Sequence, residues 1–143
     1  MLTRHAEGIW NGDLPTGKGT ITTQSGVLDK KPYSFKTRFE NEKGTNPEEL
    51  IAAAHAACFS MALSHMLASA GHKPTQVQTK ADVTLDKVGE GFKITKILLT
   101  TTATVPGIDD KTFQETANKA KTGCPISQAL AATPIELNAT LTK

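Results

Sequence analysis

The chain has 143 residues, an ordinary size for one domain, and we expect a single domain over residues 1–143. Its 16 basic and 14 acidic residues give a formal charge of only +2, with both signs mixed along the chain, so we expect neither a nucleic-acid partner nor a membrane partner. The first ten residues include Arg4, His5 and Glu7 and lack the apolar run of a signal peptide or membrane span, so we expect a cytoplasmic protein.

The segment up to Glu40 predicts several short strands. Glycines and turn pairs such as Asn11-Gly12 and Ser25-Gly26 divide it. The last strand is expected from Tyr33 to Glu40, where residues alternate between an apolar and a polar face. Arg38 lies on the polar face of that predicted strand.

A long helix is predicted from Asn46 to about Ala70. Asn46 is suited to cap its first turn, Pro47 suits the first helical position, and Gly71 is a stop signal. Apolar residues occur on every side of this helix, so we expect it to be buried nearly all round. A single layer of sheet cannot cover a helix in this way.

The remainder of the chain predicts a hairpin, two helices and a last strand. A shift in the apolar phase between Ile94 and Ile97 indicates a bulge in the second hairpin strand. The expected elements are strands over Val77 to Val88 and Phe92 to Val105, a helix over about Asp110 to Thr122, a short helix opened by Cys124-Pro125, and a strand from Ile135 to Leu141.

The two cysteines are the first candidates for chemistry, because a permanent disulfide is not expected in a reducing compartment. Cys58 lies in the middle of an apolar helix, which by itself favours an inert thiol, since nothing there stabilises a thiolate. Cys124 lies at a predicted helix start, where free backbone N–H groups favour a thiolate. Their separation in the sequence neither requires nor forbids contact.

The histidines offer a metal site or a Cys–His dyad as alternatives, since His55 and His65 lie near the helical face of Cys58. The dense ligand spacing of a zinc site is lacking, and His5 and His72 fall outside the helix. The sequence also lacks a phosphate-binding loop and a serine elbow. We therefore expect no metal and no bound cofactor.

Several motifs resemble the OsmC and organic hydroperoxide resistance (Ohr) family, and together they extend over nearly the whole chain. They are Gly17-Lys18-Gly19-Thr20, Ser25-Gly26-Val27-Leu28, Thr37-Arg38-Phe39, Gly44 to Ile51, Ala56 to Leu63 and Gly123 to Ser127. The segment from Asn46 to Cys58 and the Gly-Cys-Pro segment are specific in combination.

The resemblance implies an α+β fold in which two protomers intertwine and antiparallel sheets wrap around two long central helices. It implies a thiol-dependent peroxidase that reduces organic hydroperoxides to alcohols and protects against oxidative stress. Cys58 would be the peroxidatic cysteine and Cys124 the resolving one, with Arg38 and Glu48 as charged partners that activate and orient. A sulfenic acid on Cys58 would condense with Cys124 to a disulfide, and a dithiol of the lipoyl type would reduce it.

Helix geometry adds a further expectation about the charged pair. Glu48 precedes Cys58 by ten positions, roughly 15 Å along a continuous helix, which a glutamate side chain cannot span. Because no proline or glycine interrupts that segment, we expect Arg38 and Glu48 of one protomer to serve Cys58 of the other.

Apolar neighbours are expected to favour an alkyl hydroperoxide over hydrogen peroxide, with Phe39, Phe59, Met61 and Ile126 as candidates. Two other functions stay open. The first is a redox sensor, in which the Cys58–Cys124 switch alters a partner surface without turnover. The second is a structural dimer whose thiols are inert.

Overall fold

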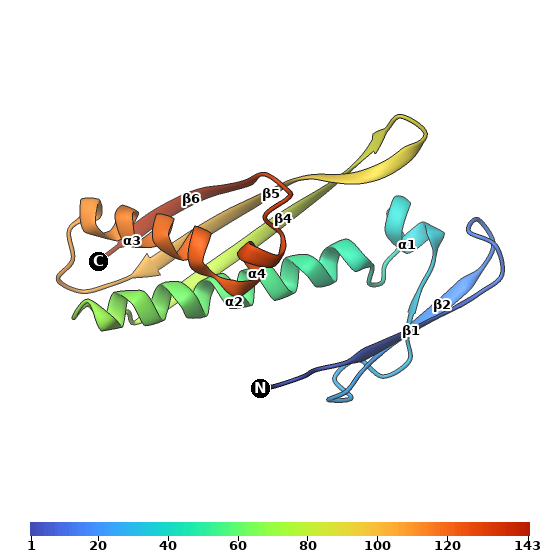
Figure 1. Cartoon of the computed structure of the whole chain (residues 1–143), viewed down its shortest axis with the longest axis horizontal. Coiled ribbons are helices and arrows are strands. Elements are labelled where there is room, and N and C mark those ends of the chain that lie inside the picture. Colours follow the sequence, from blue (N-terminus) through green and yellow to red (C-terminus); the bar gives the residue numbers. More distant parts are fainter. The chain divides into compact units, whose positions relative to one another are not determined.

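The computed structural model describes residues 1–143, and the chain divides into two compact units, Met1–Leu50 and Ile51–Lys143. Each unit has its own three-stranded sheet. Figure 1 shows the elements of both units, coloured along the chain from blue at the N-terminus to red at the C-terminus. The single domain expected from the chain length stays a prediction.

The first unit contains an antiparallel sheet in the order β1-β2-β3, formed by β1 (Ala6–Asn11), β2 (Lys18–Thr23) and β3 (Lys31–Tyr33). Gly19 lies beneath the ring of Tyr33, where an added Cβ would stand 2.5 Å from a ring carbon. Glycine at this position therefore lets the aromatic ring lie directly on the sheet.

The strand predicted from Tyr33 to Glu40 is wrong beyond its first residue, because a short helix, α1 (Phe35–Phe39), follows β3. The Ser34 hydroxyl accepts the N–H of Thr37 at 3.3 Å, and the Thr37 hydroxyl accepts the N–H of Ser34 at 2.9 Å. This capping box starts the helix. Phe35 and Phe39 lie on one face of this helix, with ring centroids 4.9 Å apart. Their spacing of four residues is compatible with one face of a strand and with one face of a helix.

The long helix α2 (Pro47–Ser69) begins and ends as predicted, to within a residue. The Asn46 side chain accepts the N–H of Glu49 at 2.8 Å and so caps the first turn. Gly71 has a φ of +88°, which ends the helix. By length and composition alone α2 could cross a membrane, a test that buried core helices also pass.

One face of α2 is buried, where Phe59, Leu63 and Leu67 have no exposed surface. Other positions are exposed in the chain, and Met61 is 75% exposed. The prediction that α2 is buried nearly all round is therefore wrong for a single chain, because one sheet covers only one side of a helix. The exposed positions of α2 from Ala53 to Met61 are Ala53, Ala54, Ala57 and Met61.

The second sheet has the order β4-β5-β6 and lies along α2 (Figure 1). Strands β4 (Gln76–Val88) and β5 (Gly91–Thr104) form the predicted hairpin. The predicted bulge is confirmed, because Thr84 pairs with Lys96 and Leu85 pairs with Ile94, which leaves Thr95 unpaired.

The last strand, β6 (Ile135–Thr142), pairs with β5 in parallel. The expected antiparallel arrangement therefore holds for every strand pair except this one. The connection explains the direction: α3 (Asp110–Gly123) and α4 (Pro125–Ala129) lie between the two strands, and a helical crossover returns the chain to the same end of the sheet. Helix α3 packs on β6, where the Gln114 side chain donates to the Ala139 carbonyl at 2.7 Å.

Candidate active site

Arg38 and Glu48, both in the first unit, form a forked ion pair. The Nη2 of Arg38 donates to Oε1 of Glu48 at 2.8 Å, and its Nε lies 3.2 Å from both carboxylate oxygens. Glu48 is buried, and the Arg38 guanidinium also lies over the ring of Phe39, 5.2 Å from its centroid. The fork and the stacked ring fix the plane of the guanidinium, which a lysine in this place would not do.

Local contacts bring the two charged residues together. The Asn46 amide donates to the Thr37 carbonyl at 3.0 Å while it caps α2, so one side chain joins the middle of α1 to the start of α2. Gly44 lies in the connecting loop, where an added Cβ would stand 2.8 Å from the Thr37 side chain. The motif from Gly44 to Asn46 therefore supports the ion pair rather than only starting a helix.

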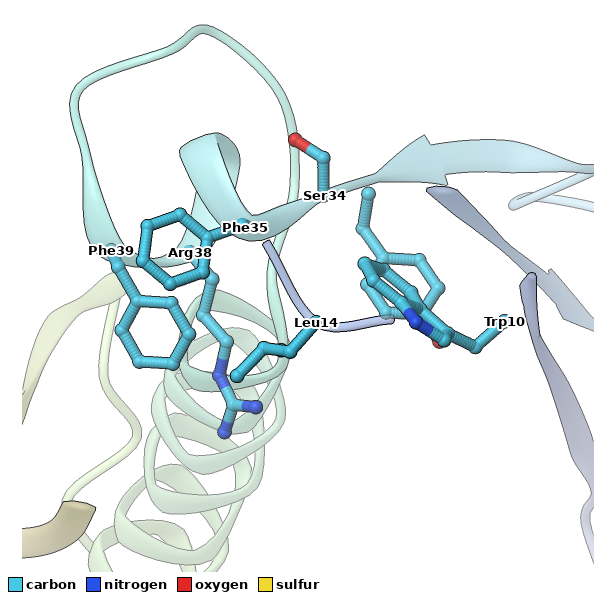
Figure 2. Close-up of a pocket in the computed structure, with 7 residues that line it drawn as sticks. Trp10, Leu14, Ser34, Phe35, Arg38 and Phe39 are labelled. Atoms are coloured by element: carbon cyan, nitrogen blue, oxygen red, sulfur yellow. The ribbon is translucent and has the colours of Figure 1, made fainter. Parts of the chain in front are cut away.

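An apolar pocket of about 220 Å³ lies beside Arg38. In Figure 2, Phe35 and Phe39 lie to one side of the Arg38 side chain and Leu14 lies to the other. The lining residues are Trp10, Leu14, Tyr33, Ser34, Phe35, Arg38 and Phe39. A fixed cation in an otherwise apolar pocket suits a ligand with a polar group and a hydrocarbon part.

The two cysteines lie together in the second unit, on α2 and at the junction of α3 and α4. The Cys124 thiol donates to the Cys58 sulfur, and the two sulfurs are 2.8 Å apart. Both are free thiols, since a disulfide bond would be about 2.05 Å long. Cys124 is fully buried, whereas Cys58 is partly exposed, so Cys58 is the thiol that a reagent reaches first.

The surroundings of Cys58 within this unit disfavour its thiolate. Burial raises the pKa of the Cys58 thiol, and the hydrogen bond and charge of Cys124 raise it further. The backbone N–H of Ile126, in the first turn of α4, lowers this pKa. None of these groups is a cation, so the second unit by itself does not supply the group that a reactive thiolate needs.

His55 does not form the dyad or metal site that the sequence left open. Its Nε2 is hydrogen-bonded to the hydroxyl of Ser127 at 2.7 Å, and no cluster of three or more His, Cys, Asp or Glu side chains is arranged to hold a metal. Sequence reasoning missed Ser127. The available signal was spacing, because His55 and Ser127 each lie three residues from a cysteine.

The four apolar residues predicted to lie near the site have different surroundings in the structure. Phe39 lines the pocket beside Arg38, and Ile126 directs its N–H at Cys58. Phe59 is buried in the core and so is not available to a ligand, which corrects the expectation for that residue. Met61 is mostly exposed on α2.

Similarity to known proteins extends over most of the chain. Residues 40–139 match the family of OsmC-like proteins. The chain is 62% identical to the peroxiredoxin OsmC of Escherichia coli K12 over 133 residues, which cover 92% of this chain and 93% of the relative. It is 35% identical to the organic hydroperoxide resistance protein OhrB of Bacillus subtilis, over 78% of this chain and 80% of that one.

Solved structures agree with this assignment. The crystal structure of OhrB of Bacillus subtilis superposes with a TM-score of 0.69 at 29% identity, covering 96% of this chain and 98% of that one. An organic hydroperoxide resistance protein from Elizabethkingia anophelis gives a TM-score of 0.73 at 27% identity, over 100% and 97% of the two chains. With the match over residues 40–139, these likenesses place the α+β fold among OsmC and Ohr proteins, and the chain belongs to the OsmC-like family.

Proposed function

We propose that this protein is a thiol-dependent peroxidase that reduces organic hydroperoxides to alcohols and so protects the cell against oxidative stress. The observation that carries the proposal is the pair of free thiols 2.8 Å apart, of which Cys58 is partly exposed and Cys124 is buried. The names of the relatives, a peroxiredoxin and organic hydroperoxide resistance proteins, support the same activity.

The proposed reaction uses each cysteine once. The Cys58 thiolate attacks the terminal oxygen of the hydroperoxide, the O–O bond breaks, and the alkoxide takes a proton to leave as the alcohol. The Cys124 thiol then attacks the sulfur of the Cys58 sulfenic acid. Its S–O bond breaks, an S–S bond forms, and the hydroxide leaves with the thiol proton as water. An external dithiol, which we take to be of the lipoyl type, reduces the disulfide and restores both thiols.

The thiolate requires a cation, and we assign that role to Arg38, held by Glu48. A guanidinium stabilises the thiolate before attack and the alkoxide as it leaves. The pKa of Cys58, which is raised within its own unit, supports the need for such a group. The forked ion pair supports a guanidinium presented in one fixed orientation.

We further propose a homodimer in which Arg38 and Glu48 of one protomer complete the site of Cys58 in the other. Helix α2 is continuous from Pro47 to Ser69, so the ten residues from Glu48 to Cys58 correspond to roughly 15 Å of helix. The apolar exposed positions of α2 also support a partner that covers them.

The pocket beside Arg38 is the proposed binding site for the alkyl part of the substrate. Its aromatic and aliphatic lining, which includes Trp10, Leu14 and Phe39, would remove a hydrocarbon group from water. Hydrogen peroxide has no such group and would gain nothing there. We keep the cytoplasm as the proposed location, because the proposed cycle needs a reducing compartment to return the disulfide to thiols.

The proposal is tested by anaerobic consumption of cumene hydroperoxide against hydrogen peroxide, with dihydrolipoamide as reductant. We expect kcat/KM for cumene hydroperoxide to be greater by about tenfold or more, since burial of a few apolar carbons contributes that much. Equal or better efficiency with hydrogen peroxide would contradict the preference. A redox sensor would react once without turnover, and a structural dimer with inert thiols would lose no thiol at all.

A further inference from the structure

A second polar contact joins α2 to α4, one turn away from the cysteines. His55 Nε2 and Ser127 Oγ are 2.7 Å apart, and the two residues are 0% and 4% exposed. His55 precedes Cys58 by three residues, and Ser127 follows Cys124 by three. The two helices are therefore connected at two successive levels, one by the thiols and one by this pair.

Burial of His55 is unfavourable compared with burial of an apolar side chain at the same position. Its Nδ1 is buried without a hydrogen-bond partner, which is unfavourable because water would satisfy that atom in the unfolded chain. Burial also lowers the pKa of His55, so the ring stays neutral near pH 7. An apolar side chain would fill the same space without an unpaired atom. What the histidine adds is the directed bond from Nε2 to Ser127.

Helix α4 depends on such a bond for its position. It has only five residues, and Cys124 at its N-cap forms no side-chain capping bond. A helix of one turn or so is unstable by itself and takes its orientation from its contacts. The same helix carries the Ile126 N–H that bonds the Cys58 sulfur. Any tilt of α4 would therefore change both the thiol separation and this bond.

We propose that His55 is a positioning residue, which through Ser127 holds α4 against α2 so that Cys124 stays within bonding reach of Cys58. From 2.8 Å the sulfurs need to approach to only about 2.05 Å to form the disulfide. The consequence for turnover rests on the proposed function: the pair speeds resolution of the Cys58 sulfenic acid, and it affects the first oxidation less, only through the Ile126 N–H.

Thiol–disulfide equilibrium with glutathione tests the positioning without any hydroperoxide. The equilibrium constant between the Cys58–Cys124 disulfide and glutathione has units of concentration. It gives the effective concentration of the Cys124 thiol at Cys58, which is higher the better the two thiols are held together. In Ser127→Ala we expect it to fall about tenfold, the effect of one buried hydrogen bond. His55→Gln, whose amide extends toward the position of Nε2, should retain most of the wild-type value. An unchanged effective concentration in Ser127→Ala would overturn the inference.

Ser60→Ala is the matched control, because Ser60 lies two residues after Cys58 and donates to the Thr79 hydroxyl at 2.8 Å, on the sheet rather than on α4. We expect it to leave the effective concentration unchanged. An equal fall in both serine variants would indicate general loosening of α2 and overturn the inference. The double variant His55→Leu/Ser127→Ala, which leaves no unpaired partner and so favours folding, should show the same tenfold fall, about the effect of one hydrogen bond.

Rapid mixing with one equivalent of cumene hydroperoxide then tests the catalytic consequence. In Ser127→Ala disulfide formation should slow about tenfold. The loss of the first thiol should slow by less, because it depends on α4 only through the Ile126 N–H. A dimedone-trappable sulfenic acid should accumulate in this variant and not in Ser60→Ala. If the wild-type protein does not react with the hydroperoxide, the proposed function fails, and the glutathione equilibrium still decides the positioning role.

Discussion

Cys58 and Cys124 differ in exposure and in their neighbours, and these differences decide which of them reacts first. Cys124 has no exposed surface, whereas Cys58 is partly exposed and receives the Ile126 N–H. A bulky hydroperoxide can therefore approach only one of the two sulfurs. The other sulfur already lies at the distance from which a disulfide closes.

The first residue-scale prediction is that serine substitutions of the two cysteines have unequal effects. Cys58→Ser should abolish oxidation by cumene hydroperoxide, because the exposed sulfur is lost. Cys124→Ser should still consume one equivalent and leave a sulfenic acid that dimedone traps. Mass spectrometry of the trapped protein measures both results. A sulfenic acid trapped on Cys124 in Cys58→Ser would reverse the assignment.

The second prediction concerns the pKa of Cys58, measured in a Cys124→Ser background from thiolate absorbance against pH. Within its own unit the pKa of this thiol is raised, so the protonated form dominates at neutral pH. If Arg38 supplies the missing cation, Arg38→Ala should raise the pKa further relative to the parent and lower the rate with cumene hydroperoxide about 100-fold. Arg38→Lys retains the charge but loses the forked pair with Glu48. It should therefore restore only part of the change in the Cys58 pKa and only part of the rate. An unchanged pKa in Arg38→Ala would contradict the role of this residue.

At the scale of elements, the ion pair depends on how two helices are joined. Asn46 caps α2 and also bonds the carbonyl of Thr37 in α1, so it fixes the distance from Arg38 to Glu48. We expect Asn46→Ala to lower the free energy of unfolding by about 1–2 kcal/mol, through loss of the cap and of the bond to α1. Chemical denaturation measures this loss.

Activity should fall with that stability loss, because Arg38 would no longer be presented in one orientation. Asn138→Ala is the control, since Asn138 is exposed on β6 and has no side-chain hydrogen bond. It should change neither stability nor activity. A stable Asn46→Ala protein with wild-type activity would show that the ion pair does not need this junction.

Local patterns predicted the elements whose signals are local. The cap at Asn46, the stop at Gly71 and the phase shift near Thr95 were all legible in the sequence and are confirmed. The short helix around Arg38 was not predicted, because two phenylalanines four residues apart fit a strand face and a helix face equally well. The direction of β6 relative to β5 depends on the helical crossover that joins them. The alternation of apolar and polar residues within β6 does not reveal that direction.

The candidate site was predictable in its residues and their pairing only through the family resemblance. The family motifs named Arg38, Glu48, Cys58 and Cys124, and the structure pairs the first two and the last two. Neither pairing follows from sequence separation, since each depends on tertiary packing. The bond of His55 to Ser127 was hidden for the same reason, although both residues lie one turn from a cysteine.

At the scale of the whole molecule, the chain by itself leaves part of α2 exposed. Ala53, Ala54, Ala57 and Met61 are apolar and exposed, on a helix whose other face is fully buried. The three alanines are small and allow a second helix to approach closely. The proposed two-fold dimer would bury this surface, and in that proposal the charged pair of one chain serves the thiols of the other.

The final prediction uses mixed dimers to decide which chain supplies Arg38. A dimer of one Cys58→Ser chain and one Arg38→Ala chain contains, if sites are shared between chains, one site with both residues intact. It should then show up to half of the wild-type activity, although the Cys58→Ser parent dimer is inactive and the Arg38→Ala parent dimer retains only about a hundredth of it. If each site belongs to one chain, both sites of this dimer are defective, and no activity returns.

The reciprocal dimer reverses both expectations and so serves as the control. It pairs a wild-type chain with a chain that carries Cys58→Ser and Arg38→Ala together. Shared sites would each contain one defect, because the intact Cys58 would face the altered Arg38 and the intact Arg38 would face the altered Cys58. Sites within one chain would leave the wild-type chain fully active. Activity in the reciprocal dimer and none in the first would therefore assign Arg38 to the same chain as Cys58 and exclude the shared site.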